Sequence, residues 1–267
     1  MEETSPGGLE DLPRSIRRYP YRGRDDFVAL KTHEASLPNR NDHFLITNIS
    51  KREFKHDFLN IEDKTFSWKE YSCSSNLLLA RMPSQEHGLA VELFDRKVGQ
   101  ALARWGLDDA LDPTGNSEFY LGSSFKNPDK GWRPDSRDYP TVVLEVGVSE
   151  RPKQLREEAA RWLQESVGEV QAVITMKVSQ YTPDITIQRW VNDNAKPVMK
   201  NETRISKSKP TRANPNSTTR VDNGPFTIPF RDFFLRQPTL NSNESDFTIT
   251  DEELMMMAKK IWGIQNF

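Results

Sequence analysis

The sequence predicts an α/β fold in which a mixed β-sheet core is flanked by helices, with an N-terminal β extension and a C-terminal helix. Residues 141–148 and 170–178 are apolar, β-branched runs of the kind that form buried strands. Residues 150–166, between them, have the periodicity of an amphipathic helix. A strand, a helix and a strand in this order predict a parallel pair joined by a right-handed crossover.

A longer helix is predicted before this unit, over residues 84–105. Ser84 is a suitable N-cap, and Gly106 is suited to end the helix as a C′ glycine. One stripe of the helical wheel collects His87, Val91, Phe94, Val98, Ala101, Leu102 and Trp105. This stripe should pack against the sheet. His87 is therefore either a core histidine or a residue that lines a pocket.

The remaining elements extend the fold on both sides. Residues 25–81 alternate short apolar runs with polar turns, which predicts an N-terminal β region. Residues 185–191 and 196–200 predict an antiparallel pair at the edge of the sheet. Residues 250–253 form a capping-box pattern at the start of a helix over residues 251–262, which should dock on the body of the protein.

The chain divides into four predicted parts, and its 267 residues are enough for one elaborated domain. Residues 1–24 are expected to be disordered, residues 25–199 to form the domain with its N-terminal β region, residues 200–222 to form a basic flexible loop, and residues 223–267 to form a C-terminal segment that docks on the same domain. The loop is predicted from composition. Six basic residues lie between Lys200 and Arg220 against one acid, among many Ser, Thr, Asn and Pro residues.

Composition limits the function classes. No segment approaches the roughly 20 apolar residues of a membrane span, and the N-terminus has no apolar core of a secretory signal, so an intracellular location in cytoplasm or nucleus is expected. Cys73 is the single cysteine, which excludes an internal disulfide and a cysteine-based zinc cluster. The net charge of −2 gives no global signal for nucleic acid, so any such binding must rest on a local patch. The oligomeric state is not indicated.

Glu145 is the one carboxylate within the predicted central strand. A buried ionised carboxylate costs several kcal/mol unless it is paired, hydrogen-bonded or bound to a metal. Asp135 follows Pro134 in the turn before the strand, and it can supply a second carboxylate. Mg²⁺ takes one or two carboxylates and keeps its other positions for water and phosphate oxygens. Asp135 and Glu145 are therefore the predicted metal ligands.

The order of the motifs resembles a known family. In chain order they are Gly122-Ser-Ser-Phe-Lys126, Pro134-Asp135, Val142-Val-Leu-Glu145-Val-Gly147, the helical positions Leu155, Ala159, Trp162 and Leu163, and Ala172-Val-Ile-Thr-Met-Lys-Val178. Over roughly residues 82–190, and again in the C-terminal helix, this order resembles a large group of fungal proteins related to the PD-(D/E)XK, restriction endonuclease-like nucleases. The resemblance implies a mixed sheet flanked by helices, with Asp135 and Glu145 in the places of the motif's Asp and Glu, which hold one or two Mg²⁺ ions.

In the motif, a lysine two positions after the Glu orients the attacking water. This lysine has no counterpart here, because Gly147 stands at that position. Glycine can neither polarise a water nor stabilise charge on a phosphate. Lys126, on the preceding strand, is the best substitute that the sequence offers. Lys153 and Arg156 at the start of the following helix and Lys177 on the next strand are further candidates.

Two functions are consistent with these observations. One is a Mg²⁺-dependent nuclease-like protein that hydrolyses DNA phosphodiester bonds, with Asp135, Glu145 and Lys126 at its catalytic site. The alternative is a catalytically inactive nuclease fold that acts as a binding or scaffold protein through the basic loop. Each carboxylate also has a structural interpretation. Asp135 could cap a turn, and Glu145 could be the buried partner of Lys177 or Lys126.

Overall fold

A computed structural model describes residues 8–37, 41–59, 63–114, 117–135, 137–208 and 218–267. The chain forms two compact units. The first consists of residues 1–84 and 116–128, and the second of residues 85–115 and 129–267. These limits do not follow the four predicted parts, because the chain enters the second unit at residue 85, returns to the first at residue 116 and leaves it again at residue 129.

The first unit is built on a six-stranded sheet with the strand order β1-β2-β4-β3-β7-β6. Its elements are the strands β1 (Arg18–Pro20), β2 (His43–Thr47), β3 (Trp68–Ser72), β4 (Leu77–Arg81), β6 (Phe119–Leu121) and β7 (Ser124–Lys126), the helices α1 (Arg24–Ser36) and α2 (Lys51–Asp57), and the 3-10 turns η1 (Leu9–Asp11) and η2 (Lys64–Phe66). An aromatic cluster forms its core, in which the rings of Phe54 and Tyr71 stack with centroids 4.0 Å apart. This sheet is the predicted N-terminal β extension.

The two helices of the first unit are absent from the sequence prediction. Helix α1 buries Phe27 and Glu34, which lie seven residues apart, so no apolar stripe marks it as a helix. The structure also differs from the expectation of disorder over residues 1–24. Leu9 is buried against Leu45 and Leu79, and Arg17 donates two hydrogen bonds of 2.6 Å to the buried carboxylate of Glu34. Residues 1–7 lie outside the described residues.

The second unit contains a seven-stranded mixed sheet with the order β13-β12-β11-β10-β9-β8-β5. Its strands are β5 (Leu111–Pro113), β8 (Lys130–Pro134), β9 (Val142–Gly147), β10 (Ala172–Val178), β11 (Asp184–Asp193), β12 (Lys196–Lys207) and β13 (Thr219–Asp222), beside the two-stranded sheet of β14 (Phe226–Ile228) and β15 (Phe247–Ile249). Its helices are α3 (Gln85–Trp105), α4 (Pro152–Glu165), α5 (Phe230–Phe234) and α6 (Asp251–Gln265). The predicted fold class is confirmed.

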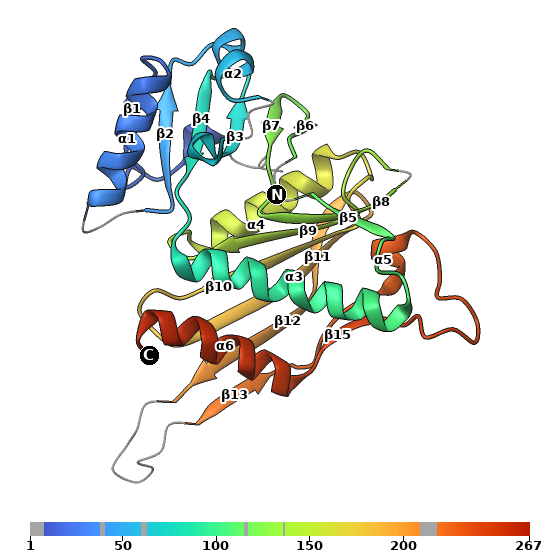
Figure 1. The fold of residues 1–267 in the computed structure, drawn as a ribbon. Coiled ribbons are helices and arrows are strands. Elements are labelled where there is room, and N and C mark those ends of the chain that lie inside the picture. The colour runs from blue at the N-terminus through green and yellow to red at the C-terminus, as the bar shows by residue number, and fades with distance from the viewer. Residues whose placement is uncertain (1–7, 38–40, 60–62, 115–116, 136, 209–217) are drawn as a thin grey trace, which may run out of the picture. The chain divides into compact units, whose positions relative to one another are not determined.

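The central strands are arranged as predicted. Strands β9 and β10 are parallel, with α4 as the crossover, and the other neighbouring pairs of this sheet are antiparallel. The alternate residues Val142, Leu144 and Val146 of β9 belong to one core cluster with buried residues of α3 and α6. Figure 1 shows these two helices side by side on that face of the sheet. The intervening residues of β9 face α4 on the other side.

Three local predictions are confirmed at the helix ends and in the edge strands. Gly106 follows α3 with a φ of +70°, a conformation that favours glycine and ends the helix. Thr250 accepts a hydrogen bond from the backbone of Glu253, which completes the capping box of α6. Strands β11 and β12 form the predicted antiparallel pair around the turn at Asn194.

The predicted flexible loop over residues 200–222 is wrong for most of its described part. Strand β12 continues to Lys207, and β13 begins at Thr219, while residues 209–217 lie outside the described residues. Thr203 and Ile205 are buried at alternate positions, which is a strand pattern that the basic composition obscured. Acidic residues also pair with the basic side chains at Lys200–Asp193, Arg204–Asp184 and Arg220–Asp222, with distances of 2.7, 3.0 and 2.7 Å.

Within the described ranges, no helix combines the length and the apolar character needed to cross a membrane.

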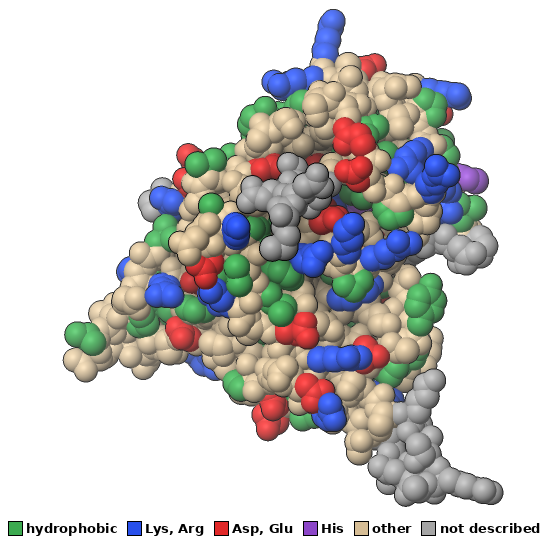
Figure 2. Space-filling model, turned by 180° about the vertical axis from the view of Figure 1, so that it is seen from behind, with side chains coloured by type: hydrophobic (Ala, Val, Ile, Leu, Met, Phe, Trp, Pro, Cys, Tyr) green, Lys and Arg blue, Asp and Glu red, His purple; other side chains and the backbone are tan. Residues whose placement is uncertain are grey.

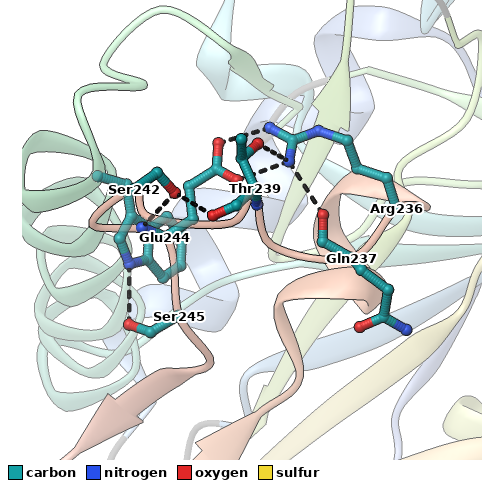
Figure 3. Close-up of polar contacts among 7 residues, drawn as sticks. Arg236, Gln237, Thr239, Ser242, Glu244 and Ser245 are labelled. Atoms are coloured by element: carbon teal, nitrogen blue, oxygen red, sulfur yellow. Dashed lines mark hydrogen bonds and ion pairs between the residues drawn. The ribbon is translucent and has the colours of Figure 1, made fainter.

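A charged contact organises the segment between α5 and β15. Figure 3 shows the Arg236 guanidinium facing the Glu244 carboxylate, and each of two guanidinium nitrogens donates a 2.7 Å hydrogen bond to it. The backbone N–H of Thr239 donates to the same carboxylate at 2.6 Å. The Arg236 guanidinium also lies over the ring of Phe230, 4.9 Å from its centroid. The hydrogen bonds from Arg236 and Thr239 lower the pKa of Glu244 to about 2, and the hydrogen bond from Arg236 is the largest cause.

This contact predicts a pH-dependent stability. The folded pKa of Glu244 is below its ordinary value of 4.5, so the stabilisation is fully present above pH 4.5 and is lost as pH falls towards 2. We expect Glu244→Gln to lower the melting temperature at pH 6, and this difference from the wild type to shrink steadily between pH 4.5 and pH 2. Calorimetry of both proteins over this range measures the effect. A difference that is independent of pH would contradict the assignment.

Candidate functional site

Glu145 lies in the middle of the second unit's sheet, on β9, and its side chain is fully buried. The indole N–H of Trp162 donates a 2.7 Å hydrogen bond to its Oε1. Trp162 belongs to the predicted apolar stripe of α4, so the crossover helix supplies the donor for the carboxylate on the strand that it covers. This contact provides one of the interactions that a buried carboxylate requires.

The structure does not bring Asp135 to Glu145. Asp135 is exposed in the turn after β8. Strands β8 and β9 are antiparallel, with Trp132 opposite Val142 and Lys130 opposite Leu144. Asp135 and Glu145 therefore lie about six residues apart along the ladder, roughly 20 Å at the rise of a strand. Asp135 therefore lies in a turn. This position agrees with the alternative that the sequence left open, in which Asp135 is a turn residue and not a metal ligand.

Asp129 is the carboxylate at the correct end of β8. The register places Lys130 opposite Leu144, so its continuation by one residue sets Asp129 opposite Glu145. The Oδ2 atom of Asp129 accepts a 2.7 Å hydrogen bond from the backbone N–H of Val146, which immediately follows Glu145. Asp129, which the sequence pattern did not single out, thus lies next to the central strand.

His87 holds the other oxygen of Asp129. Its Nε2 lies 3.2 Å from Asp129 Oδ1, and both side chains are almost fully buried. His87 is thus on the inner face of α3, as predicted, and its contact ties the helix to the end of β8. The signal for Asp129 was present in the sequence, because Pro128-Asp129 is a Pro-Asp pair six residues before Pro134-Asp135. Choosing between the two pairs requires the strand register.

Gly147 occupies a position without room for a side chain. A Cβ atom there would lie 2.9 and 3.1 Å from the two terminal carbons of Leu155, and 2.8 Å from Glu150 Oε2. Leu155 is buried in the first turns of α4 and cannot easily move away. The close packing of α4 on the end of β9 therefore favours glycine, because any side chain at this position requires Leu155 and Glu150 to shift.

Lys177 is the basic residue that the structure places beside Gly147. The two residues are register partners in the parallel pair of β9 and β10, so Lys177 is on the same face as Glu145. Its ammonium donates to the backbone carbonyl of Val148. The other substitutes have different environments. Lys126 is fully buried in the first unit, 3.8 Å from Glu70, and Lys153 is exposed on α4 beside Glu157.

The donor chemistry of this site fits a hard cation. Asp129 and Glu145 offer carboxylate oxygens from adjacent strands, where Asp129 contacts α3 through His87 and Glu145 contacts α4 through Trp162. Two carboxylates are the usual protein share of a Mg²⁺ site. Each carboxylate oxygen has more than one lone pair, so a hydrogen bond from His87 or Trp162 does not preclude a metal bond. Among the described residues, no three His, Cys, Asp or Glu side chains converge on one point as a ready metal cage.

The comparisons with known proteins give a match to solved structures and none to a sequence family or a curated protein. Among solved structures, the fold is similar to a candidate nuclease belonging to DUF820 from Anabaena variabilis ATCC 29413. The two chains are 10% identical, the likeness covers 76% of this chain and 97% of that chain, and the TM-score is 0.43. This likeness is too distant to bear on the activity of the chain.

The packing at Gly147 predicts a measurable cost for the smallest side chain. We expect Gly147→Ala to destabilise the protein by about 1–3 kcal/mol, because the new Cβ overpacks against Leu155. Gly99→Ala is the matched control. Gly99 lies in the interior of α3 with nothing within 4 Å of its Cβ position, so alanine should stabilise the helix by about 0.5–1 kcal/mol. Urea unfolding of the three proteins measures both effects. Equal stability of Gly147→Ala and wild type would contradict the packing account.

Proposed function

We propose that this protein is a Mg²⁺-dependent nuclease-like phosphodiesterase that acts on DNA, with Asp129 and Glu145 as the metal ligands. The observation that carries the proposal is the position of Asp129. Continuing the strand register by one residue sets it opposite Glu145, and it follows a proline, which supports an acidic pair of the kind that the sequence resemblance implies. Asp129 replaces Asp135 in this role.

The chain's own residues would prepare the site by fixing the two carboxylates. The backbone N–H of Val146 and the imidazole of His87 hold Asp129, and the indole of Trp162 holds Glu145. Contacts of this kind orient ligand oxygens before a cation binds, and their loss typically weakens metal affinity by about 10–100-fold. Bound Mg²⁺ would polarise the phosphate and lower the pKa of a water molecule that attacks it.

Lys177 would supply the positive charge that Gly147 lacks. Its ammonium is on the face of Glu145, at the end of the neighbouring strand, and it is held by the carbonyl of Val148. A fixed cation near the scissile phosphate stabilises the charge that develops in the transition state. The role of the missing lysine can thus be filled from β10 instead of β9.

A second candidate function is supported by the burial of the same residues. The side chains of Asp129 and Glu145 are 1% and 0% exposed, and their hydrogen bonds connect core elements. In an inactive protein of this fold they would serve stability, and the molecule would act as a binding or scaffold protein.

The face shown in Figure 2 has basic and acidic side chains interspersed. The ion pairs on β12 and β13 likewise reduce the charge of the predicted basic surface.

Three isosteric variants test the proposal. We expect Mg²⁺ and Mn²⁺ to raise the melting temperature of the wild type and to support DNA cleavage, because a metal at 100 times its Kd stabilises the folded state by about 2.7 kcal/mol. Asp129→Asn and Glu145→Gln should lose both effects together, since each removes a ligand charge and keeps an acceptor oxygen for its neighbours. Asp135→Asn is the matched control and should retain both. Single- and double-stranded DNA are the substrates.

The outcomes separate the two functions. Loss of metal stabilisation and cleavage in Asp135→Asn, with both retained in Asp129→Asn, would overturn the assignment of the ligands. A wild type that neither responds to metal nor cuts DNA, and that is destabilised by both core substitutions, would favour the inactive binding protein.

Lys177→Met tests the substituted cation. We expect cleavage to fall by about 10²–10³-fold, as for the loss of one transition-state donor. Metal affinity should stay the same or rise, because a positive charge has been removed from the side of the cation. Lys153→Met, an exposed lysine on α4, is the matched control and should behave as the wild type. Calorimetric titration with Ca²⁺ measures affinity without turnover. A parallel fall in Ca²⁺ affinity and cleavage would instead indicate a structural role for Lys177.

A further inference from the structure

A cavity of about 420 Å³ lies in the second unit, apart from the two carboxylates, between α6 and the ends of β12 and β13. Its lining consists of Lys207, Thr219, Met255, Lys259, Trp262, Gly263 and Phe267. This volume is within the range of pockets that bind small molecules, about 300–1,000 Å³. The mixture of basic, hydroxyl and apolar groups on its wall favours a ligand that carries both an anionic group and an apolar body.

Two ammonium groups from different elements give this cavity its charge. Lys207 ends β12 and Lys259 lies on α6, and none of the described residues that line the cavity is acidic. Neither lysine has an ion-pair partner within the part of the chain that the structure describes, whereas Lys200 on the same strand is paired with Asp193 at 2.7 Å. Two lysines on the wall of one hollow raise its potential and favour an anion.

The fold holds the two sides of the cavity in place. Ile205, two residues before Lys207 on the same face of β12, is buried in the core cluster that contains α6. The backbone N–H of Lys207 donates a 3.0 Å hydrogen bond to the carbonyl of Pro183. On the other side, the amide of Gln265 donates a 2.9 Å hydrogen bond to the carbonyl of Ser179 and ties the end of α6 to the strand ends. The lysines are therefore presented from anchored elements.

The remaining wall suits a ring-bearing body. Met255 contributes a thioether and Phe267 a ring that is 37% exposed, whereas Trp262 is 1% exposed and belongs to the core cluster behind them. Aromatic and thioether surfaces favour flat, polarisable groups, such as a base that stacks on an aromatic side chain. Thr219 adds one hydroxyl that can donate to an oxygen.

We propose that this cavity binds a phosphate monoester with a ring-bearing body, as in a nucleoside monophosphate. A phosphate monoester carries a charge of about −1.5 to −2 at pH 7 and offers three acceptor oxygens, which matches two ammonium groups and a hydroxyl better than a single carboxylate does. The ring then contacts the apolar wall. This site does not depend on the carboxylates of the proposed metal site.

Calorimetric titration of the full chain with AMP tests the proposal, with adenosine, inorganic phosphate and decanoate as separate probes. We expect AMP to bind at least 10-fold more tightly than either adenosine or phosphate, because each of these supplies half of the contacts. Lys207→Ala and Lys259→Ala should each weaken AMP binding by 10-fold or more. Lys260→Ala, next to Lys259 on α6 and outside the cavity lining, is the matched control and should bind AMP as the wild type does.

Several results would overturn the proposal. They are an absence of AMP binding, AMP binding no tighter than that of phosphate or decanoate, and AMP binding that both pocket variants retain. Circular dichroism of each variant checks that the fold is intact. Glu145→Gln should leave AMP affinity unchanged. A failure of the metal site and a failure of this cavity are therefore separate outcomes.

Discussion

The buried carboxylate of Glu145 is the constraint on which the centre of the second unit depends. It stands in the middle of a strand whose other residues are apolar, and at 0% exposure it requires a fixed donor. Trp162 provides that donor from α4, so the hydrogen bond sets the position of the crossover helix along β9. Because α4 is held there, Leu155 lies against the end of the same strand. The packing of the helix and the chemistry of the strand are thus one arrangement.

The glycine at position 147 follows from this arrangement. The space that a side chain would need is taken by Leu155 and Glu150, so a lysine two residues after Glu145 would displace both of them. A basic group can reach this place from the neighbouring strand, where Lys177 is the register partner of Gly147. On the other side of β9, Asp129 is held by His87 and by the backbone of Val146. Acidic and basic groups thus reach the second half of β9 from three places. They are Asp129 just before β8, Lys177 on β10 and His87 on α3.

Local sequence patterns predicted the elements that have a regular apolar period. The stripe from His87 to Trp105, the strand around Glu145 and the crossover helix with Trp162 are where they were expected, because burial on one face leaves a period in the sequence. Helix α1 left no such period, since its buried positions are Phe27 and Glu34. Strand β12 did leave one, at Thr203 and Ile205, but the basic residues around it outweighed that signal.

The candidate site was only half predictable for a different reason. Glu145 could be predicted, because it is the one charged residue in an apolar strand. Its partner depends on the antiparallel register of β8 and β9, which is a long-range property that a count along the chain does not reveal. Pro128-Asp129 and Pro134-Asp135 are equivalent as sequence motifs, yet they lie at opposite ends of β8. Only the first of them lies opposite Glu145 when the register of β8 and β9 is continued by one residue.

We propose that Asp129 and Glu145 bind one cation together. Diffraction from crystals grown with Mn²⁺, recorded where manganese scatters anomalously, locates such a cation. We expect an anomalous peak within bonding distance of oxygens from both carboxylates. A peak at Asp135, or no peak while Asp129 and Glu145 keep their contacts to His87 and Trp162, would contradict it.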